Sequence, residues 1–358
     1  MLAEQNLGGA LIISQHNFAW LTAGGANGVD MSREAGSGAL LVTRDGKRFV
    51  LANRIEMPRL LDEELSGAEF EPIEFPWEEE KASPTLLVTR ALKLLGNSEA
   101  LGADVNLGVE ALPIDGAVAS CRYELTSSEI ERFRSLGGHA ALAVANLARS
   151  LEPGETEIEV AHRLAHALAA YDIRAVVNLV AADERIGQYR HPVPTHRRWE
   201  KTLMMVVCAR RGGLTASLTR LVCNGRIPEE LQRRTLAVAR VNSQLLSRTQ
   251  PGATGSDLYK VAARAYAAEG FEGEQHLHHQ GGACGYRTRD WVAHPASAEV
   301  VRPQQAFAWN PSITGTKTEE TCVVSADGVE ILTASPAWPT ISVSIGKREY
   351  TSPGVLSL

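Results

Sequence analysis

Two helices followed by strands occur twice in the second part of the chain, and this repeated order narrows the possible folds sharply. Thr126 and Glu129 form a capping-box pattern that starts a helix expected over 127–150, which ends before Pro153-Gly154. Thr156 and Glu159 form the same pattern at the start of a helix expected over 156–171. The other elements expected there are helices over 228–248 and 255–269 and strands over 174–181, 203–209, 306–309, 319–325 and 329–333. The repeat predicts a duplicated α/β domain whose halves close on each other and hold a site between them.

The first third of the chain is predicted to form a separate α/β domain. Apolar, β-branched runs over 8–14 and 39–52 indicate strands, and the Asp-Gly pair inside the second run indicates a hairpin turn. Further elements expected there are helices near 54–66 and 83–95 and a short strand near 107–110. We therefore predict an α+β protein with an N-terminal α/β domain over 1–122 and a second domain over 123–358 that includes a C-terminal tail.

Composition favours a small-molecule partner over nucleic acid or a membrane. The 358 residues are 44% hydrophobic and 22% charged, which is enough apolar material for two domains, and the formal net charge is −6. No basic excess is present to neutralise a phosphate backbone, and no apolar run approaches the roughly 20 residues of a membrane span. The five cysteines form no CxxC pair, and together with the lack of a targeting signal they lead us to expect a protein of the reducing cytoplasm.

Polar and glycine residues gather in four clusters, each beside the end of an expected strand. The clusters are YRHPVPT over 189–195, GGLTASLTR over 212–220, HLHHQGGACGYRTRDW over 276–291 and WNPSITGTKTEET over 309–321. Glycine allows the backbone to approach a ligand closely, while histidine and carboxylate side chains can exchange protons with it. The clusters therefore predict one concave site.

In this order and spacing the four clusters resemble the family of creatinase, prolidase, aminopeptidase P and methionine aminopeptidase. The resemblance covers residues 126–335, and NFAWLTAGG over 17–25 is similar to a strand and turn of the prolidase and creatinase N-terminal domain. It implies a creatinase-like α/β domain followed by a pita-bread domain, usually in a homodimer. It also implies a small-molecule or short peptide-like substrate, with no nucleic acid and no membrane as partner.

The active peptidases of this family bind two divalent metals through two aspartates, one histidine and two glutamates. Carried over position by position, the resemblance places Ser217 and Val206 where the aspartates stand. Asn310 takes the place of the first glutamate, which leaves His279 and Glu319. Because the bridging carboxylates that compensate the charge of two close cations are missing, we expect no dinuclear metal and no cofactor.

Two assignments stay open at this stage. His278 has the same spacing to a following glycine as His279, so either could correspond to the histidine ligand. Carboxylates near Asp183, Glu184 or Asp290 could also rebuild a metal centre if the correspondence is shifted. In that case the alternative is a metal-dependent Xaa-Pro aminopeptidase or dipeptidase.

His191 is the residue expected to carry the chemistry. It matches the histidine that contacts the substrate in the family's peptidases and that serves as acid and base in metal-free creatinase. A neutral imidazole can take a proton from water and return it to a departing nitrogen, which is worth about 10² to 10⁴ in rate. Glu319 could orient the water or bind a cationic nitrogen, with Asn310 and Ser217 as neutral hydrogen-bond donors.

The substrate is expected to carry a carboxylate. Tyr286 stands where the family has a second pocket histidine, and Arg287 and Arg289 beside it could grip a carboxylate in a bidentate manner, although a surface ion pair is an equal alternative. Thr219 precedes Arg220 where creatinase has a glutamate, so recognition of a guanidinium group is not expected. The predicted catalytic residues are His191, His279 and Glu319, and the predicted substrate-binding residues are Asn310, Ser217, Tyr286, Arg287, Arg289, Arg220, His278 and Trp309.

Three functions follow from this pattern. The first is a metal-independent, creatinase-like hydrolase or lyase that cleaves a carbon–nitrogen bond in a small peptide-like or amidine-like carboxylic acid. The second is the metal-dependent Xaa-Pro peptidase. The third is a non-catalytic pita-bread binding module, which the convergence of the polar residues on one cleft disfavours.

Overall fold

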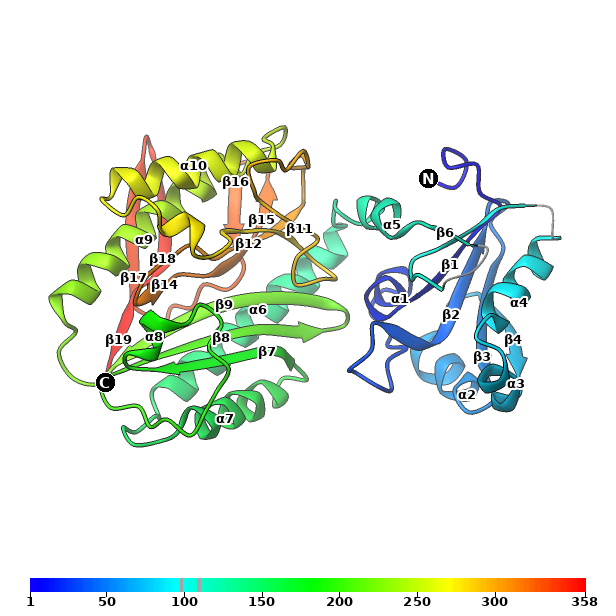
Figure 1. The fold of residues 1–358 in the computed structure, drawn as a ribbon, viewed down its shortest axis with the longest axis horizontal. Coiled ribbons are helices and arrows are strands. Elements are labelled where there is room, and N and C mark those ends of the chain that lie inside the picture. Colours follow the sequence, from blue (N-terminus) through cyan, green and yellow to red (C-terminus); the bar gives the residue numbers. More distant parts are fainter. Residues whose placement is uncertain (97–98, 108–110) are drawn as a thin grey trace. The chain divides into compact units, whose positions relative to one another are not determined.

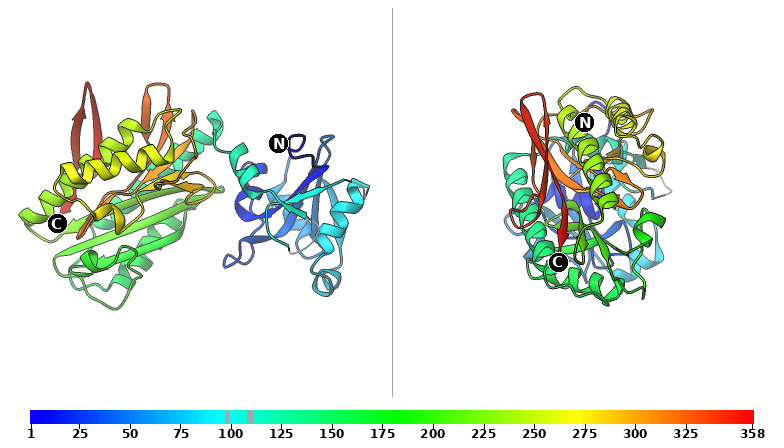
Figure 2. Two further views of the ribbon diagram at one scale, coloured as in Figure 1. Left: turned by 45° about the horizontal axis from the view of Figure 1, so that its top comes forward. Right: turned by 90° about the vertical axis from the view of Figure 1, so that its left-hand side faces the viewer.

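The computed structural model describes residues 1–96, 99–107 and 111–358, and the chain divides into two compact units, Met1–Arg122 and Tyr123–Leu358 (Figures 1 and 2). The first unit contains β1 (Gly9–Ser14), α1 (Gln15–Leu21), β2 (Ala35–Thr43), β3 (Arg48–Asn53), α2 (Met57–Arg59), η1 (Leu60–Glu64), β4 (Glu71–Phe75), α3 (Trp77–Ala82), α4 (Leu86–Leu95), β5 (Leu101–Ala103), β6 (Ala111–Pro113) and α5 (Asp115–Cys121). The short strand expected near 107–110 falls almost wholly outside the described residues.

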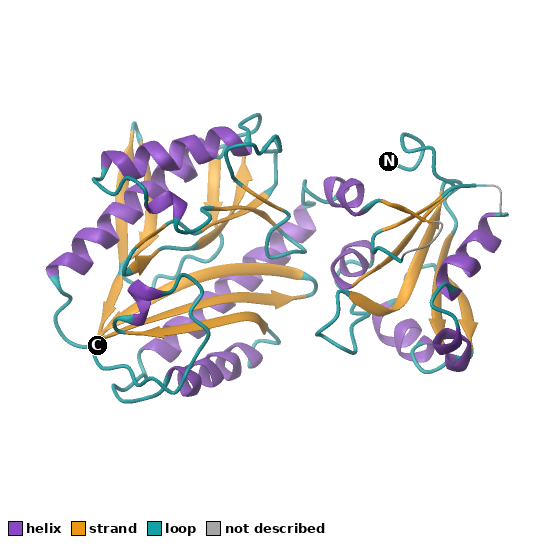
Figure 3. Ribbon diagram, viewed as in Figure 1, coloured by secondary structure: helices purple, strands orange, loops and turns teal. Residues whose placement is uncertain are grey.

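The sheet of Met1–Arg122 has the order β4-β3-β2-β1-β5-β6 and is covered on both faces (Figure 3). Successive residues of a strand point to opposite faces, so β1 supplies Ala10 and Ile12 to one core and Leu11 and Ile13 to the other. Residues of α1, η1 and α5 belong to the first core, and residues of α4 belong to the second. This alternation explains why the apolar run of β1 has no polar face.

The hairpin expected over 39–52 is confirmed, since β2 and β3 pair in antiparallel register. Gly46 in its turn has φ +90°, a conformation that glycine adopts without strain. The helix expected near 54–66 is shorter than predicted and consists of the three-residue α2 followed by the π-helical turn η1. Pro58 lies in the first turn of α2, where the missing backbone N–H is tolerated.

The second unit contains the elements α6 (Ser127–Ala148), α7 (Glu157–Ala169), β7 (Arg174–Ala182), α8 (Arg185–Gln188), β8 (Thr202–Arg211), β9 (Leu214–Cys223), α9 (Glu229–Arg248), α10 (Gly255–Ala268), η2 (Glu274–His276), β10 (Gly281–Cys284), β11 (Trp291–Val292), β12 (Ala306–Trp309), β13 (Ser312–Ile313), β14 (Thr316–Lys317), β15 (Glu320–Ser325), β16 (Gly328–Ile331), β17 (Thr340–Ile345), β18 (Arg348–Pro353) and β19 (Val355–Ser357). In Figure 1, α6 and α7 lie along the sheet β19-β9-β8-β7, and α9 and α10 lie along the sheet β11-β10-β12-β15-β16. The repeated order of two helices and then strands is thus confirmed.

Both capping boxes expected from the sequence are present. Thr126 accepts a hydrogen bond from the backbone of Glu129, whose side chain accepts one from the Thr126 backbone, and Thr156 and Glu159 repeat this arrangement at the start of α7. The capping boxes fix where α6 and α7 begin. These helices pack on each other and on the sheet β19-β9-β8-β7.

Strand β9 and the strands of the C-terminal tail are among the elements that the sequence did not predict. The segment 214–223 is the fully buried strand β9, whose bridge from Thr219 to Glu319 joins the two sheets. The C-terminal tail is likewise ordered: β17 and β18 form a hairpin beside α9, visible in Figure 2, and β19 pairs in parallel with β9. Strand β19 of the tail therefore completes the sheet β19-β9-β8-β7.

Helix α6 is among the long helices of the described residues, and none of the helices described is long and apolar enough to cross a membrane.

Candidate active site

His191 lies on the segment that follows α8, and a buried carboxylate holds that segment in place. Glu157 at the start of α7 is fully buried and accepts hydrogen bonds from the backbone nitrogens of Ala182 and Thr195 and from the Thr195 hydroxyl. It also pairs with Arg185 of α8. Because one carboxylate joins α7, β7, α8 and the end of the loop, the backbone around His191 is anchored at both sides.

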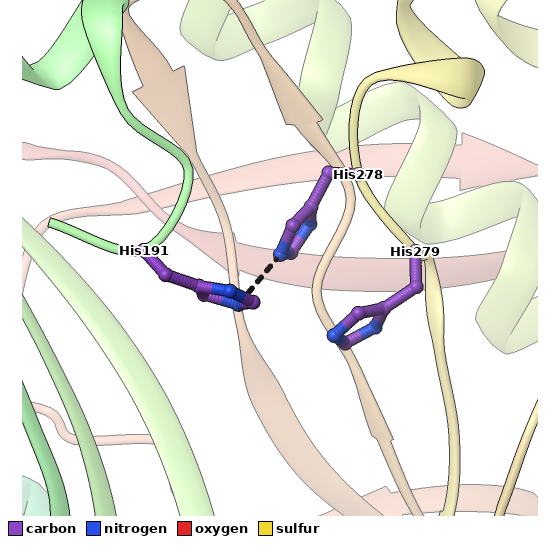
Figure 4. Close-up of side chains that lie close together, drawn as sticks. All are labelled: His191, His278 and His279. Carbon is purple, nitrogen blue, oxygen red and sulfur yellow. Dashed lines mark hydrogen bonds between the residues drawn. The ribbon is translucent and has the colours of Figure 1, made fainter.

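His278 and His279 come from the segment between η2 and β10 and meet His191 (Figure 4). The Nε2 atoms of His278 and His191 lie 3.1 Å apart, so one imidazole donates a hydrogen bond to the other. The His278 and His279 rings are stacked with centroids 4.4 Å apart. The structure therefore brings together both histidines between which the sequence could not decide.

Glycines at the start of β10 set the position of these two histidines. Gly281 has φ +100°, and a Cβ on it would lie 2.1 Å from the Ala308 carbonyl oxygen. A Cβ on Gly282 would lie 2.1 Å from the Trp291 carbonyl oxygen. Only glycine lets β10 approach both neighbouring strands this closely, so the Gly-Gly pair is part of the site architecture.

All three imidazoles are neutral at pH 7. Burial lowers the pKa of His278 to about 2, with Lys317 and the other histidines adding to the effect. Burial, Arg289 and Lys317 lower the pKa of His279 to about 4, and burial and Lys317 also lower the pKa of His191. A neutral imidazole presents a nitrogen lone pair that can accept a proton or bind a metal ion.

Glu319 faces this cluster as a buried anion held by two cations. Its oxygens lie 3.1 Å from Lys317 Nζ and 3.0 Å from Arg289 Nη2, and the Thr219 hydroxyl donates to it over 2.8 Å. Burial alone would raise the pKa of Glu319, but Lys317, Arg289 and Thr219 outweigh it and lower this pKa to about 2. Glu319 is therefore ionised at pH 7 and is a weak base.

Lys317 was missed by sequence reasoning, although a signal for it exists. It ends β14 and lies two residues before Glu319, and both side chains are buried. In an extended chain, residues two apart point to the same side, so a lysine at this spacing from a site carboxylate could have been assigned to the site.

Ser217 and Asn310 border the same region. The Ser217 hydroxyl donates to Cys208 Sγ over 3.3 Å and lies 3.4 Å from Arg289 Nη1. The Asn310 backbone nitrogen donates to the Gln280 carbonyl oxygen, next to His279. Its side-chain Oδ1 is buried and has no hydrogen-bond partner in the described part of the chain. Cys208 is buried, and burial raises the pKa of its thiol, so it is not a ready nucleophile.

Other predicted site residues have structural contacts away from Glu319. Tyr286 donates a hydrogen bond to Glu129 of α6. Arg220 points to the side of β9 opposite to its neighbour Thr219 and pairs with buried Glu320. The backbone carbonyl of Arg287 accepts a hydrogen bond in the turn at Gly285.

Trp309 was expected beside the substrate, but it lies in the hydrophobic core. Its side chain is 0% exposed, stacks on Phe307 and donates from Nε1 to the Thr249 hydroxyl over 3.0 Å. Since neighbouring residues of a strand point in opposite directions, proximity to Asn310 in the sequence did not place Trp309 in the site.

The side chains at the family's metal-ligand positions limit which metals the site could hold. Val206 and Ser217 on β8 and β9 offer no carboxylate, and the oxygens of Glu319 already contact two cations and a hydroxyl. These residues do not fit a pair of metals bridged by carboxylates. In the described ranges, the histidine, cysteine, aspartate and glutamate side chains form one group whose ligand atoms all lie within 4.8 Å of one another, namely His191, His278 and His279. This group fits a single metal ion.

The comparisons with known proteins agree with this fold. The model of metallopeptidase family M24 matches residues 131–331, more than half of the chain. The chain is similar to a recombinant prolidase from Thermococcus sibiricus, with TM-score 0.79, 18% identity and coverage of 100% of this chain and 96% of that one. It is similar to the Xaa-Pro dipeptidase from Bacillus anthracis, with TM-score 0.75, 17% identity and coverage of 100% and 97%. For proline aminopeptidase P II from Yersinia pestis the TM-score is 0.71, the identity 16% and the coverage 93% of each chain. Among curated proteins, none matches.

These likenesses confirm the resemblance to the prolidase and aminopeptidase P family and the α+β class with a pita-bread fold. They also correct one expectation. We predicted that the protein needs no cofactor, and this is wrong, because the family whose model matches the chain is one of metallopeptidases. The prediction of no cofactor relied only on the carboxylates missing at Val206, Ser217 and Asn310. It did not consider that imidazole nitrogens can also bind a metal ion.

Proposed function

The chain belongs to metallopeptidase family M24, and from this premise we propose that it is a hydrolase of a carbon–nitrogen bond in a small peptide-like or amidine-like substrate that carries a carboxylate. Since one fold hosts several chemistries, the substrate class is argued from the site. The observation that carries the proposal is the charge balance around Glu319.

Three charged groups meet in this buried region: the Glu319 anion and the cations of Lys317 and Arg289. The imidazoles opposite them are neutral, so one positive charge is left without a counter-charge. An unbalanced charge in a low-dielectric site favours a ligand of opposite sign, and a carboxylate bound to a guanidinium or ammonium group forms a strong hydrogen bond. The substrate is therefore an acid, with its carboxylate directed to Arg289 and Lys317.

Water is activated at the imidazoles. His191 is exposed and its segment is anchored, so it can reach both a water molecule and a bound substrate. In the neutral form it would take a proton from water and return one to the departing nitrogen. His278 and His279 would orient this imidazole.

The test measures hydrolysis of a dipeptide panel, in which each peptide is offered with a free C-terminal carboxylate and as its C-terminal amide. We expect the free acids to be cleaved and the amides to be poor substrates. His191→Ala should lower kcat/KM by at least a hundredfold. The control is His196→Ala, an exposed histidine five residues away. Equal turnover of the parent and His191→Ala, or of acids and amides, contradicts the proposal.

A second candidate is an Xaa-Pro dipeptidase that requires a divalent metal. It is favoured by the likeness to structures named as an Xaa-Pro dipeptidase and a prolidase and by the group of three histidines. Peptides with proline in the second position distinguish the candidates. Cleavage confined to Xaa-Pro acids supports the dipeptidase, whereas cleavage of other peptide-like acids contradicts it. The homodimer and the cytoplasmic location remain predictions.

A further inference from the structure

We propose that His191, His278 and His279 bind one divalent transition-metal ion through their ring nitrogens. This site differs from the set of aspartates, glutamates and one histidine that the family resemblance implies. The inference rests on the proposed function for its catalytic meaning and changes one step of it: a lone pair that binds an ion cannot also take a proton, so in the loaded protein the ion would activate the water in place of His191. Binding of the ion is measured separately from hydrolysis.

The spacing of the nitrogens supports a shared ion. Zinc binds imidazole nitrogen at about 2.0–2.1 Å in tetrahedral geometry, which separates two nitrogen ligands by roughly 3.3 Å. The Nε2 atoms of His191 and His278 are already 3.1 Å apart, and His279 brings a ligand atom within 4.8 Å of both. Small rotations of the rings would therefore direct all three lone pairs to one point.

The origin of the ligands also suits a metal site. His278 and His279 are held by the close approach of β10 to its neighbours, and His191 is held by the Glu157 network, so the three imidazoles come from anchored segments. The His278 ring is 7% exposed and its Nδ1 has no hydrogen-bond partner in the described ranges. Its shared hydrogen bond with His191 would be replaced by two metal–nitrogen bonds.

The neighbouring charges limit which ion can bind. Lys317 and Arg289 repel a cation, and Glu319 offsets only one of them. Hard ions such as Mg²⁺ and Ca²⁺ bind chiefly through carboxylates and are excluded by this balance. Zinc and cobalt form strong bonds to neutral nitrogen, and three imidazoles leave a fourth position open. When bound in this manner, such an ion lowers the pKa of a water molecule to about 7.

The experiment uses the full chain, freed of metal with a chelator and then loaded with Zn²⁺ or Co²⁺. Elemental analysis after gel filtration measures the bound ions per chain, and the visible absorption of the cobalt protein reports its coordination. We expect about one equivalent in the parent, and at least tenfold weaker binding in His191→Ala, His278→Asn and His279→Asn. His276→Ala, an exposed histidine of η2, is the matched control and should bind as the parent does.

The outcomes separate the two proposals. If the parent binds no ion, or if the three variants bind as well as the parent, the metal site is wrong. If His191→Ala then still abolishes hydrolysis, the proposed function stands and only this metal site is lost. If one ion binds through the three histidines but no acid is hydrolysed, the metal site stands and the proposed function is wrong. Because His191 is exposed, its substitution leaves folding unaffected and keeps the test decisive.

Discussion

Lys317 Nζ lies 3.1 Å from Glu319 Oε2, and these side chains are only 5% and 2% exposed. An ammonium group and a carboxylate that are both removed from water remain charged only if each compensates the other. Arg289 adds a second cation to the same carboxylate at 3.0 Å. This arrangement makes Glu319 the fixed negative charge of the site and leaves a surplus of positive charge, on which the proposal of an acidic substrate rests.

Replacement of Lys317 by methionine should change how stability depends on pH. The folded-state pKa of Glu319 is about 2, below its ordinary value of 4.5, so its stabilising contribution is present above pH 4.5 and is lost as the pH falls from 4.5 towards 2. Without Lys317 this pKa moves back towards 4.5. Lys317→Met should therefore be less stable than the parent by about 1–3 kcal/mol above pH 4.5, and the difference should shrink below it.

Urea unfolding in metal-free buffer at steps from pH 7 to pH 3 measures this effect. Lys347→Met is the control, because Lys347 is exposed in the turn between β17 and β18. A constant difference between Lys317→Met and the parent over this range would contradict the assigned role of the Lys317–Glu319 pair.

Replacing two adjacent glycines of α6 by alanine should change the stability of the protein in opposite directions. A Cβ on Gly137 would lie 2.3 Å from the Leu332 carbonyl oxygen, so Gly137→Ala must push the helix away and should cost about 1–3 kcal/mol. A Cβ on Gly138 meets no atom within 4 Å. Since alanine favours a helix over glycine, Gly138→Ala should stabilise the protein by about 0.5–1 kcal/mol. The unfolding temperature Tm of both variants is compared with that of the parent. Equal shifts of Tm would show that α6 does not pack on Leu332 as described.

Glu157→Gln should loosen the segment that carries His191. The neutral amide loses the pairing with Arg185 and weakens the bonds to Thr195, while the helix start retains its capping box. We expect faster amide hydrogen exchange over residues 189–195 and a lower kcat/KM, with little change in α7. Glu184→Gln, which alters an exposed carboxylate paired with Arg197, is the control. Unchanged exchange over 189–195 would remove Glu157 as a positioning residue.

Arg289→Met should weaken binding of acidic substrates more than it changes the chemical step. The guanidinium contributes to the surplus positive charge, so its loss should raise KM for a free acid at least tenfold while kcat falls less. The C-terminal amide of the same peptide should be almost unaffected. Steady-state kinetics on the acid and amide pair decides this, and an equal effect on both would mean that Arg289 acts only through Glu319.

Much of the helical framework was predictable because its signals are local. A capping box joins residues three apart, so Thr126 with Glu129 and Thr156 with Glu159 determine the starts of α6 and α7 whatever surrounds them. The hairpin of β2 and β3 was predictable for the same reason. Strand β9 was missed because its polar residues, among them Ser217 and Thr219, suggested a loop, although they are buried against the second sheet.

The sequence by itself determined the repeated helix–strand order, the pita-bread resemblance and the four polar clusters, since these depend on residue type and spacing along the chain. Only the tertiary structure decided which members of the clusters meet. It joined both His278 and His279 to His191, added Lys317 to the site and placed Trp309 in the core. The physical reason is that side-chain direction and the closeness of two sheets depend on strand register and packing, which residues distant in the sequence set together.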